Sequence, residues 1–178
     1  MDFTTELREE LVSYVKQLAE GEKSFSFSTA LLKHGRHFSP TSPKPSWLGV
    51  GQQRNCFNNA TTAAVTRSDV IYAEGYVLEP ELPIPVQHAW LLDAGGAVVD
   101  PTYADTTDHA YFGIAFRRDF VVEMLPKTKG QAGLLVNLHL LRRTYRDPVL
   151  LEGMIISGMQ YTPKLEFQGV RPLNGSFA

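Results

Sequence analysis

The chain contains very little cysteine and no long apolar run. Cys56 is the single cysteine among 178 residues, so no disulfide can form within the chain. No apolar stretch approaches the ~18 residues that a membrane-spanning helix needs. The acidic first ten residues also lack the apolar core of a signal peptide. These absences predict a soluble, unprocessed protein of the reducing cytoplasm, with no membrane partner.

Neither a large excess of one charge nor a cofactor motif is present. The chain has 17 basic and 19 acidic residues, a net charge of −2, which gives no bulk attraction to nucleic acid. The segment Gly49-Val50-Gly51 lacks the lysine of a phosphate-binding loop. A zinc site is disfavoured because there is no second cysteine and, of the five histidines, only His34 and His37 are closely spaced. We therefore expect no metal, no cofactor and no nucleic-acid partner.

Length and composition are those of one ordinary globular domain. With 43% apolar and 20% charged residues, the chain can build a sizeable core. A helical pattern is followed by strand-like runs, an order that predicts an α+β fold in which a helix packs on an antiparallel sheet. We expect a single domain over residues 1–178 that begins with a helix over residues 4–21.

The N-terminal third combines two predicted helices with a loop. Apolar residues recur at helical spacing from Leu7 to Leu18, and Thr4 or Thr5 is the expected N-cap. A second, short helix is expected over residues 29–33. Proline and glycine residues between positions 40 and 51 predict an irregular loop that leads to Cys56. We expect residues 36–53 and 103–118 to form the walls of a cleft.

The middle of the chain has the clearest pattern. Residues 56–67 suit a helix with Asn55 as its N-cap. Residues 70–78 and 86–92 are rich in β-branched and aromatic side chains and predict two strands. A turn over residues 93–96 leads to a third strand over residues 97–99, which Pro101 ends.

The C-terminal part is less regular. Residues 112–116 suggest a short extended segment, and residues 120–125 suit a strand or a helix. Leucines at helical spacing predict a core-packing helix over residues 133–146. A short helix or strand is expected over residues 149–156, and the tail beyond Thr162 shows no clear pattern.

The position of Cys56 points to a thiol nucleophile. Only the thiolate form of cysteine attacks carbonyl groups well. The predicted helix places Cys56 at its N-terminus, where the helix dipole and unpaired N–H groups stabilise a thiolate and can also hold an oxyanion. The alternative is a buried structural cysteine that acts as a small apolar residue.

His88 and Asp100 complete a candidate triad with Cys56. The two-residue period of a strand puts His88 on one face with Trp90 and Leu92, where it can serve as a general base. Asp100 ends the neighbouring strand of the predicted hairpin and can orient the histidine ring. Taken singly, each residue has a structural explanation: a core histidine for His88 and a turn aspartate for Asp100. Their order and their element types favour the triad.

These segments resemble the core of the transglutaminase-like cysteine enzymes. The resemblance covers residues 52–103. It rests on Cys56 at a helix start, Glu74-Gly75-Tyr76, His88-Ala89-Trp90 and Val99-Asp100-Pro101-Thr102. It implies a papain-like fold with Cys56 as nucleophile, His88 as base and Asp100 as orienter. The arylamine N-acetyltransferases share the triad order and are a more distant likeness.

The sequence departs from this family around the cysteine. Members often have glycine two residues before the cysteine and tryptophan beside it, whereas Arg54-Asn55 precede Cys56 here and Phe57 follows it. The second oxyanion donor is therefore open between Gln53 and Asn55. We favour Gln53, because the side chain of Asn55 is expected to cap the helix.

Two tryptophans are candidate substrate contacts. Trp47 is expected at the entrance of the cleft, with a core position as the alternative, because indole rings serve both uses. Trp90 is expected near the substrate because it shares a strand face with His88.

Three functions are consistent with the sequence. The first is a cysteine hydrolase (a protease, deamidase or amidase) that cleaves an amide of a peptide or protein through an acyl-enzyme. The second is an acyltransferase in which an amine replaces water, by transglutaminase-type crosslinking or by acetyl transfer. The third is a non-catalytic binding domain that keeps the fold.

Overall fold

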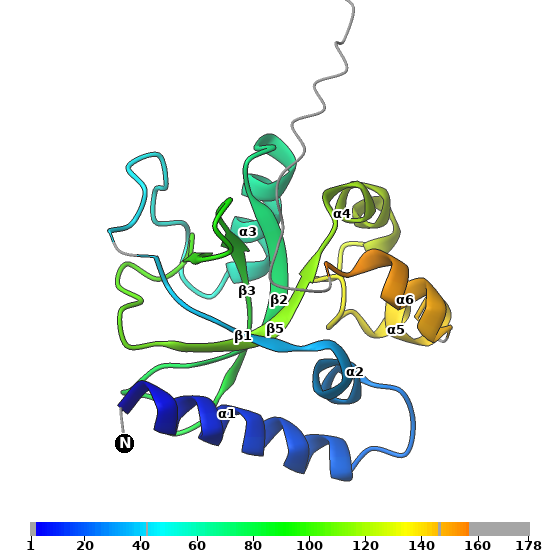
Figure 1. The fold of residues 1–178 in the computed structure, drawn as a ribbon. Coiled ribbons are helices and arrows are strands. Elements are labelled where there is room, and N and C mark those ends of the chain that lie inside the picture. The colour runs from blue at the N-terminus through cyan, green and yellow to red at the C-terminus, as the bar shows by residue number, and fades with distance from the viewer. Residues whose placement is uncertain (1–2, 42, 146, 157–178) are drawn as a thin grey trace, which may run out of the picture.

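A curled antiparallel sheet forms the centre of the molecule (Figure 1). The computed structural model describes residues 3–41, 43–145 and 147–156. The sheet has the order β1-β5-β2-β3-β4, and every neighbouring pair is antiparallel. Its strands are β1 (Arg36–Phe38), β2 (Ile71–Leu78), β3 (Val86–Leu92), β4 (Val98–Val99) and β5 (Ala110–Phe116).

The two ends of this sheet meet. After β1 the chain continues alongside β4, where the N–H of Val98 donates to the Ser39 carbonyl at 2.7 Å and that of Thr41 donates to the Val98 carbonyl at 2.9 Å. The closure encloses a small apolar cluster that includes Phe38, Trp90 and Tyr111. Gly113 in β5 leaves room for the Trp90 ring, because a β-carbon there would lie 2.5 Å from Cη2 of that ring.

Helices cover the other face of the sheet. Figure 1 shows α1 (Phe3–Glu20) and α2 (Phe27–His34) below the sheet, and α4 (Arg118–Met124), α5 (Leu138–Arg143) and α6 (Pro148–Met154) to its right. A short 3-10 turn, η1 (Leu125–Thr128), links α4 to the following loop. α3 (Cys56–Thr66) packs against β3. The larger core cluster lies between these helices and the sheet. The expected α+β class, with helices on an antiparallel sheet, is confirmed.

Glu74 ties a distant loop to the middle of this sheet. Its side chain is fully buried on the helix-covered face of β2 and accepts hydrogen bonds from the backbone N–H groups of residues 134–136. The hydroxyl of Tyr72 donates to the same carboxylate at 2.8 Å. Burial raises the pKa of Glu74, and these donors oppose the rise. Glu74 thus anchors this loop through three consecutive backbone N–H groups.

This anchor explains one error of the sequence-based prediction. A helix was expected over residues 133–146, but α5 spans only Leu138–Arg143. Gly133 has a φ of +76°, and the N–H groups that follow it bind Glu74 instead of helical carbonyls. Asn137 then caps α5 by accepting from the N–H groups of His139 and Leu140.

Other predicted elements are corrected at their edges. Thr4 and Thr5 lie inside α1, which begins at Phe3, so neither is its N-cap. The expected cleft wall over residues 36–53 begins with β1, whose pairing with β5 becomes possible only in the folded sheet. Residues 112–116 belong to β5, a central and fully buried strand, and cannot form a cleft wall. The tail beyond Thr162 lies outside the described residues.

Candidate active site

The N-terminus of α3 meets the open edge of β3. Cys56 is the first residue of α3, as its sequence pattern predicts. β4 is two residues long and pairs only with Leu91 and Leu92, which leaves the edge of β3 near Ala89 open to α3. The backbone N–H of Ala89 donates to the Cys56 sulfur. A short edge strand thus allows a helix terminus to approach a central strand.

His88 and Asp100 form a buried hydrogen-bonded pair. Nε2 of His88 lies 2.6 Å from Oδ2 of Asp100, and the two residues are 3% and 2% exposed. Both project from the face of the sheet that carries the Trp90 cluster. Since Nε2 is bound to Asp100, Nδ1 is the ring nitrogen left to interact with Cys56. The structure thus brings together the three residues of the predicted triad: Asp100 contacts His88, and His88 contacts Cys56.

The Asp100 carboxylate is saturated with donors. Oδ2 also accepts from the Tyr111 hydroxyl at 2.9 Å, and Oδ1 accepts from the N–H groups of Thr102 at 2.7 Å and Tyr103 at 3.2 Å. Burial by itself raises the pKa of Asp100, but the charge and hydrogen bond of His88 and the two N–H groups hold it below its usual value. A carboxylate held in this way remains ionised beside the histidine.

Aromatic rings fix the orientation of His88. Its ring centroid lies 4.9 Å from that of Tyr103, 6.2 Å from that of Trp90 and 6.3 Å from that of Tyr111. Trp90 is fully buried, so it has no surface with which to touch a substrate. The expected substrate-binding role of Trp90 is corrected to one of packing beneath the histidine.

The Cys56 thiol and His88 favour the charged pair. Burial raises the pKa of the Cys56 thiol. The hydrogen bond and charge of His88 and the N–H groups of Ala89 and Phe57 outweigh burial and bring this pKa below its usual value. Burial lowers the pKa of His88, yet the charge and hydrogen bond of Asp100, together with Cys56, raise it to about 9. The lowered pKa of Cys56 and the raised pKa of His88 both act in the direction of a thiolate beside an imidazolium.

A cavity of about 680 Å³ opens beside this pair. Its lining comes from the end of the loop before α3, from the ends of β2 and β3, and from the segment after Asp100. The lining residues are Val50, Gln53, Arg54, Cys56, Phe57, Glu79, Leu82, Val86, Gln87, His88, Thr102, Tyr103 and Ala104. The expected cleft walls over residues 36–53 and 103–118 thus contribute only their parts nearest the triad. This volume is within the usual range for small-molecule or side-chain pockets.

The two candidate oxyanion donors differ in position. Gln53 lines the cavity. Asn55 stands at the N-cap position of α3 but makes no side-chain capping hydrogen bond. The expectation that the Asn55 side chain caps the helix is therefore wrong. Of the two candidates, only Gln53 is among the residues that line the cavity. Arg54, between them, has a φ of 60°, a left-handed conformation that turns the chain into α3.

Trp47 lies outside this cavity. It lines a neighbouring hollow with Gly51 and Asn59, and the guanidinium of Arg67 lies 3.9 Å from the centroid of its ring. The expectation that Trp47 flanks the entrance beside Cys56 is corrected, because the two residues line different hollows. Trp47 is 38% exposed and is not a core residue either.

The structure adds residues that the sequence analysis missed. Tyr103 packs on His88, and its hydroxyl donates to Oε1 of Glu79 at 2.9 Å. Asn59, one turn into α3, donates to the Gln52 carbonyl at 2.8 Å and to Oγ1 of Thr102 at 3.0 Å, so it joins the two loops that border the site. For Tyr103, the signal available in the sequence was its position directly after Pro101-Thr102.

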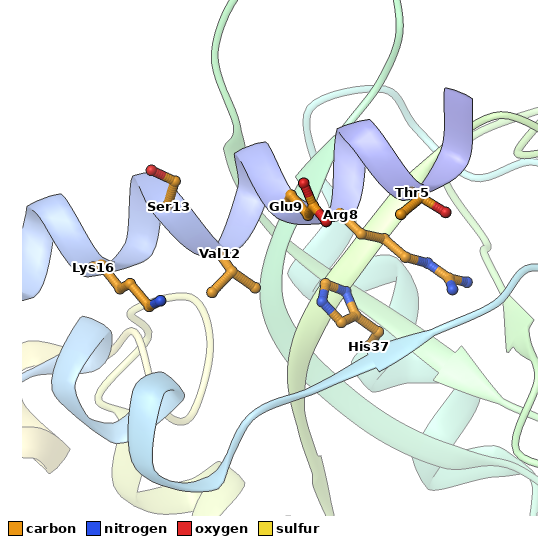
Figure 2. A pocket seen from close by; sticks show the side chains of 7 residues that line it. All are labelled: Thr5, Arg8, Glu9, Val12, Ser13, Lys16 and His37. Atoms are coloured by element: carbon orange, nitrogen blue, oxygen red, sulfur yellow. The ribbon is translucent and has the colours of Figure 1, made fainter. Parts of the chain in front are cut away.

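A third hollow, of about 560 Å³, lies between α1 and β1 (Figure 2). Figure 2 shows Arg8 and Val12 of α1 on either side of His37 of β1, with Lys16 further along the helix. No cysteine lines this hollow, and the nearby Glu9 offsets part of its positive charge. Within the described ranges, no three His, Cys, Asp or Glu side chains gather into a possible metal site. No helix there is long and apolar enough to cross a membrane.

The chain matches no protein-family model, and comparisons with curated proteins and with solved structures also find no match.

Proposed function

We propose that the protein is a cysteine hydrolase that cleaves amide bonds of a peptide or protein through an acyl-enzyme on Cys56. The observation that carries the proposal is the buried chain of contacts from Asp100 through His88 to the thiol of Cys56. Its parts match the requirements for nucleophilic catalysis: an activated thiol, a base, and a carboxylate that orients the base.

In the acylation step, the Cys56 thiolate attacks the carbonyl carbon of the amide. The carbonyl oxygen gains negative charge, and the backbone N–H of Cys56, at the free N-terminus of α3, stabilises it. The side chain of Gln53 is the second donor. His88 gives its proton to the amide nitrogen, the C–N bond breaks, and an amine leaves behind a thioester.

In the deacylation step, water replaces the departed amine. His88, now neutral, takes a proton from the water as its oxygen attacks the thioester carbonyl. The C–S bond breaks, the acid leaves, and the thiolate and imidazolium are restored. The exposed residues Val50 and Gln53 line the cavity and keep it open to solvent, which favours water over a sequestered amine as the acceptor.

The layout around Cys56 supports a papain-like arrangement of the transglutaminase-like type. A helix bearing the nucleophile packs against an antiparallel sheet, the base is on the adjoining strand β3, and the orienting carboxylate follows β4. This is the arrangement that the resemblance over residues 52–103 implies.

The test is the pH dependence of iodoacetamide alkylation at Cys56 in the folded protein, compared between wild type and His88→Ala. At pH 6 an ordinary cysteine is less than about 1% thiolate and reacts slowly. We expect rapid labelling of the wild type at this pH and a large loss of rate in His88→Ala. His139→Ala is the matched control, because His139 does not line the cavity. Slow labelling at the same rate in wild type and His88→Ala would refute the proposal and favour a non-catalytic binding domain.

A further inference from the structure

We infer that the cavity beside Cys56 binds a basic side chain, lysine or arginine, of the substrate through the carboxylate of Glu79. The inference rests on the proposed function, because it names the substrate class for the same cavity. Glu79 directly follows Leu78, the last residue of β2, and lines the cavity.

Glu79 is held in a defined place relative to the triad. Its Oε1 accepts the hydroxyl of Tyr103 at 2.9 Å, and the Tyr103 ring in turn packs 4.9 Å from the ring of His88. The backbone of Tyr103 is fixed as well, because its N–H donates to Asp100 and its carbonyl accepts Nζ of Lys44 at 2.7 Å. A carboxylate fixed through one rigid ring is a suitable recognition group.

The charge of Glu79 is left without compensation. In the described part of the chain its single ion-pair contact is with Nε2 of His109, at 3.9 Å, which is beyond hydrogen-bond distance. Burial, the largest influence, lowers the pKa of His109, so this ring is neutral at physiological pH. The second oxygen, Oε2, thus remains an acceptor with a full share of negative charge.

The rest of the wall suits the aliphatic stem of a basic residue. Val50, Phe57, Leu82 and Val86 line the same cavity. Lysine and arginine bury their methylene stems on apolar surface and extend their charged ends to a polar group. An apolar wall that leads to a single carboxylate matches that shape better than it matches a neutral or acidic side chain.

His88 also lines the cavity, but its positive charge is paired with Asp100. Arg54 is a second basic residue of the wall, and it opposes a bound cation. It is exposed at the mouth, where water screens its charge, whereas Glu79 is partly buried, with a side chain 23% exposed. We therefore expect Glu79 to dominate inside the cavity, and removing Arg54 to strengthen binding of a cation.

The bound cation is a recognition group and not the acyl acceptor. A carboxylate stabilises the protonated amine, and a protonated amine has no lone pair for attack on a thioester. A guanidinium, which cannot act as an acceptor at neutral pH, should therefore bind as well as an ammonium.

Ligand-observed NMR titration of Cys56→Ala protein tests this inference without using thiol chemistry. The probes are the Nα-acetyl amides of lysine, arginine, norleucine and glutamate. We expect the lysine and arginine probes to bind at least about fivefold more tightly than norleucine, as a partly exposed charge-assisted contact predicts. We expect the glutamate probe not to bind. Equal binding of lysine and norleucine would overturn the inference, and binding of lysine without arginine would overturn the recognition role.

Substitutions in the same background locate the contact. Glu79→Gln should remove the preference for basic probes, Arg54→Gln should increase it, and Glu81→Gln is the matched control on the same loop. Retained preference in Glu79→Gln would also overturn the inference. The alkylation assay of Cys56 is a separate measurement, so an unreactive thiol with a selective pocket would refute the hydrolase alone.

Discussion

Replacing Asp100 by asparagine should uncouple His88 from Cys56. Asparagine keeps an oxygen for the N–H groups of Thr102 and Tyr103, which now bind Oδ1. Its NH₂ group takes the place of Oδ2 and meets Nε2 of His88, so the ring must accept there and carry its proton on Nδ1. A protonated Nδ1 cannot take the proton of Cys56.

The size of this effect follows from the pKa of His88. It is about 9 in the folded protein, against an ordinary value of 6.5, with the charge of Asp100 as the largest influence that raises it. The difference corresponds to about 3 kcal/mol in favour of the imidazolium, and burial alone would lower the pKa instead. In Asp100→Asn we therefore expect His88 to titrate at or below 6.5, and the alkylation rate of Cys56 at pH 7 to fall by at least about tenfold.

Two measurements check this prediction independently. NMR titration of the His88 ring gives its pKa and its tautomer, and iodoacetamide labelling gives the reactivity of Cys56. Asp93→Asn is the matched control, because Asp93 accepts N–H groups of Gly95 and Ala97 in the β3–β4 turn and does not contact the triad. If His88 still titrated near 9 in Asp100→Asn, with labelling unchanged, the electrostatic reasoning would be refuted.

The remaining predictions concern stability. Glu74→Gln should lower the free energy of unfolding by about 2–4 kcal/mol, because the amide turns a donor toward buried N–H groups. A decrease of less than about 0.5 kcal/mol in the free energy of unfolding, measured by urea denaturation, would contradict the anchoring role of Glu74. Gly113→Ala should cost about 3 kcal/mol or more, since its β-carbon would meet the Trp90 ring and the Glu74 carbonyl, whereas Gly49→Ala, with open space, should be neutral in the same melt. In Cys56→Ala, burial lowers the pKa of His88 but Asp100 still raises it. The His88–Asp100 pair should therefore stabilise the fold fully below pH 6.5 and lose this effect as pH rises through the raised pKa, which should lie below the value of about 9 that Cys56 helps to set. If the free energy of unfolding did not change with pH, or changed equally in Cys56→Ala/His88→Gln, the predicted contribution of the His88–Asp100 pair would be wrong.

Local patterns predicted the middle of the chain well. The helix that begins at Cys56 and the strand over residues 86–92 agree with α3 and β3. The two-residue period also placed His88 and Trp90 on one face of the sheet. Such features depend on neighbours within a few residues, so the sequence is enough to predict them.

Long-range pairings were not readable in this way. β1 pairs with β5, which lies more than seventy residues further along the chain, and Glu74 captures backbone groups of residues 134–136. Both arrangements override the local pattern, since the start of a predicted cleft wall is a strand of the sheet and a predicted helix begins late. Periodicity shows which face of an element is apolar but not which distant segment covers it.

The sequence by itself determined the class of fold, the start of α3 at Cys56, and the three residues of the candidate triad. Only the tertiary structure decided that Trp90 packs under His88 and that Trp47 lies in another hollow. It also decided that Tyr103 and Glu79, joined by a hydrogen bond, line the cavity beside Cys56. The physical reason is that helix and strand periods are set by local backbone geometry. A cavity is set by side chains that converge from separate elements once the sheet has closed.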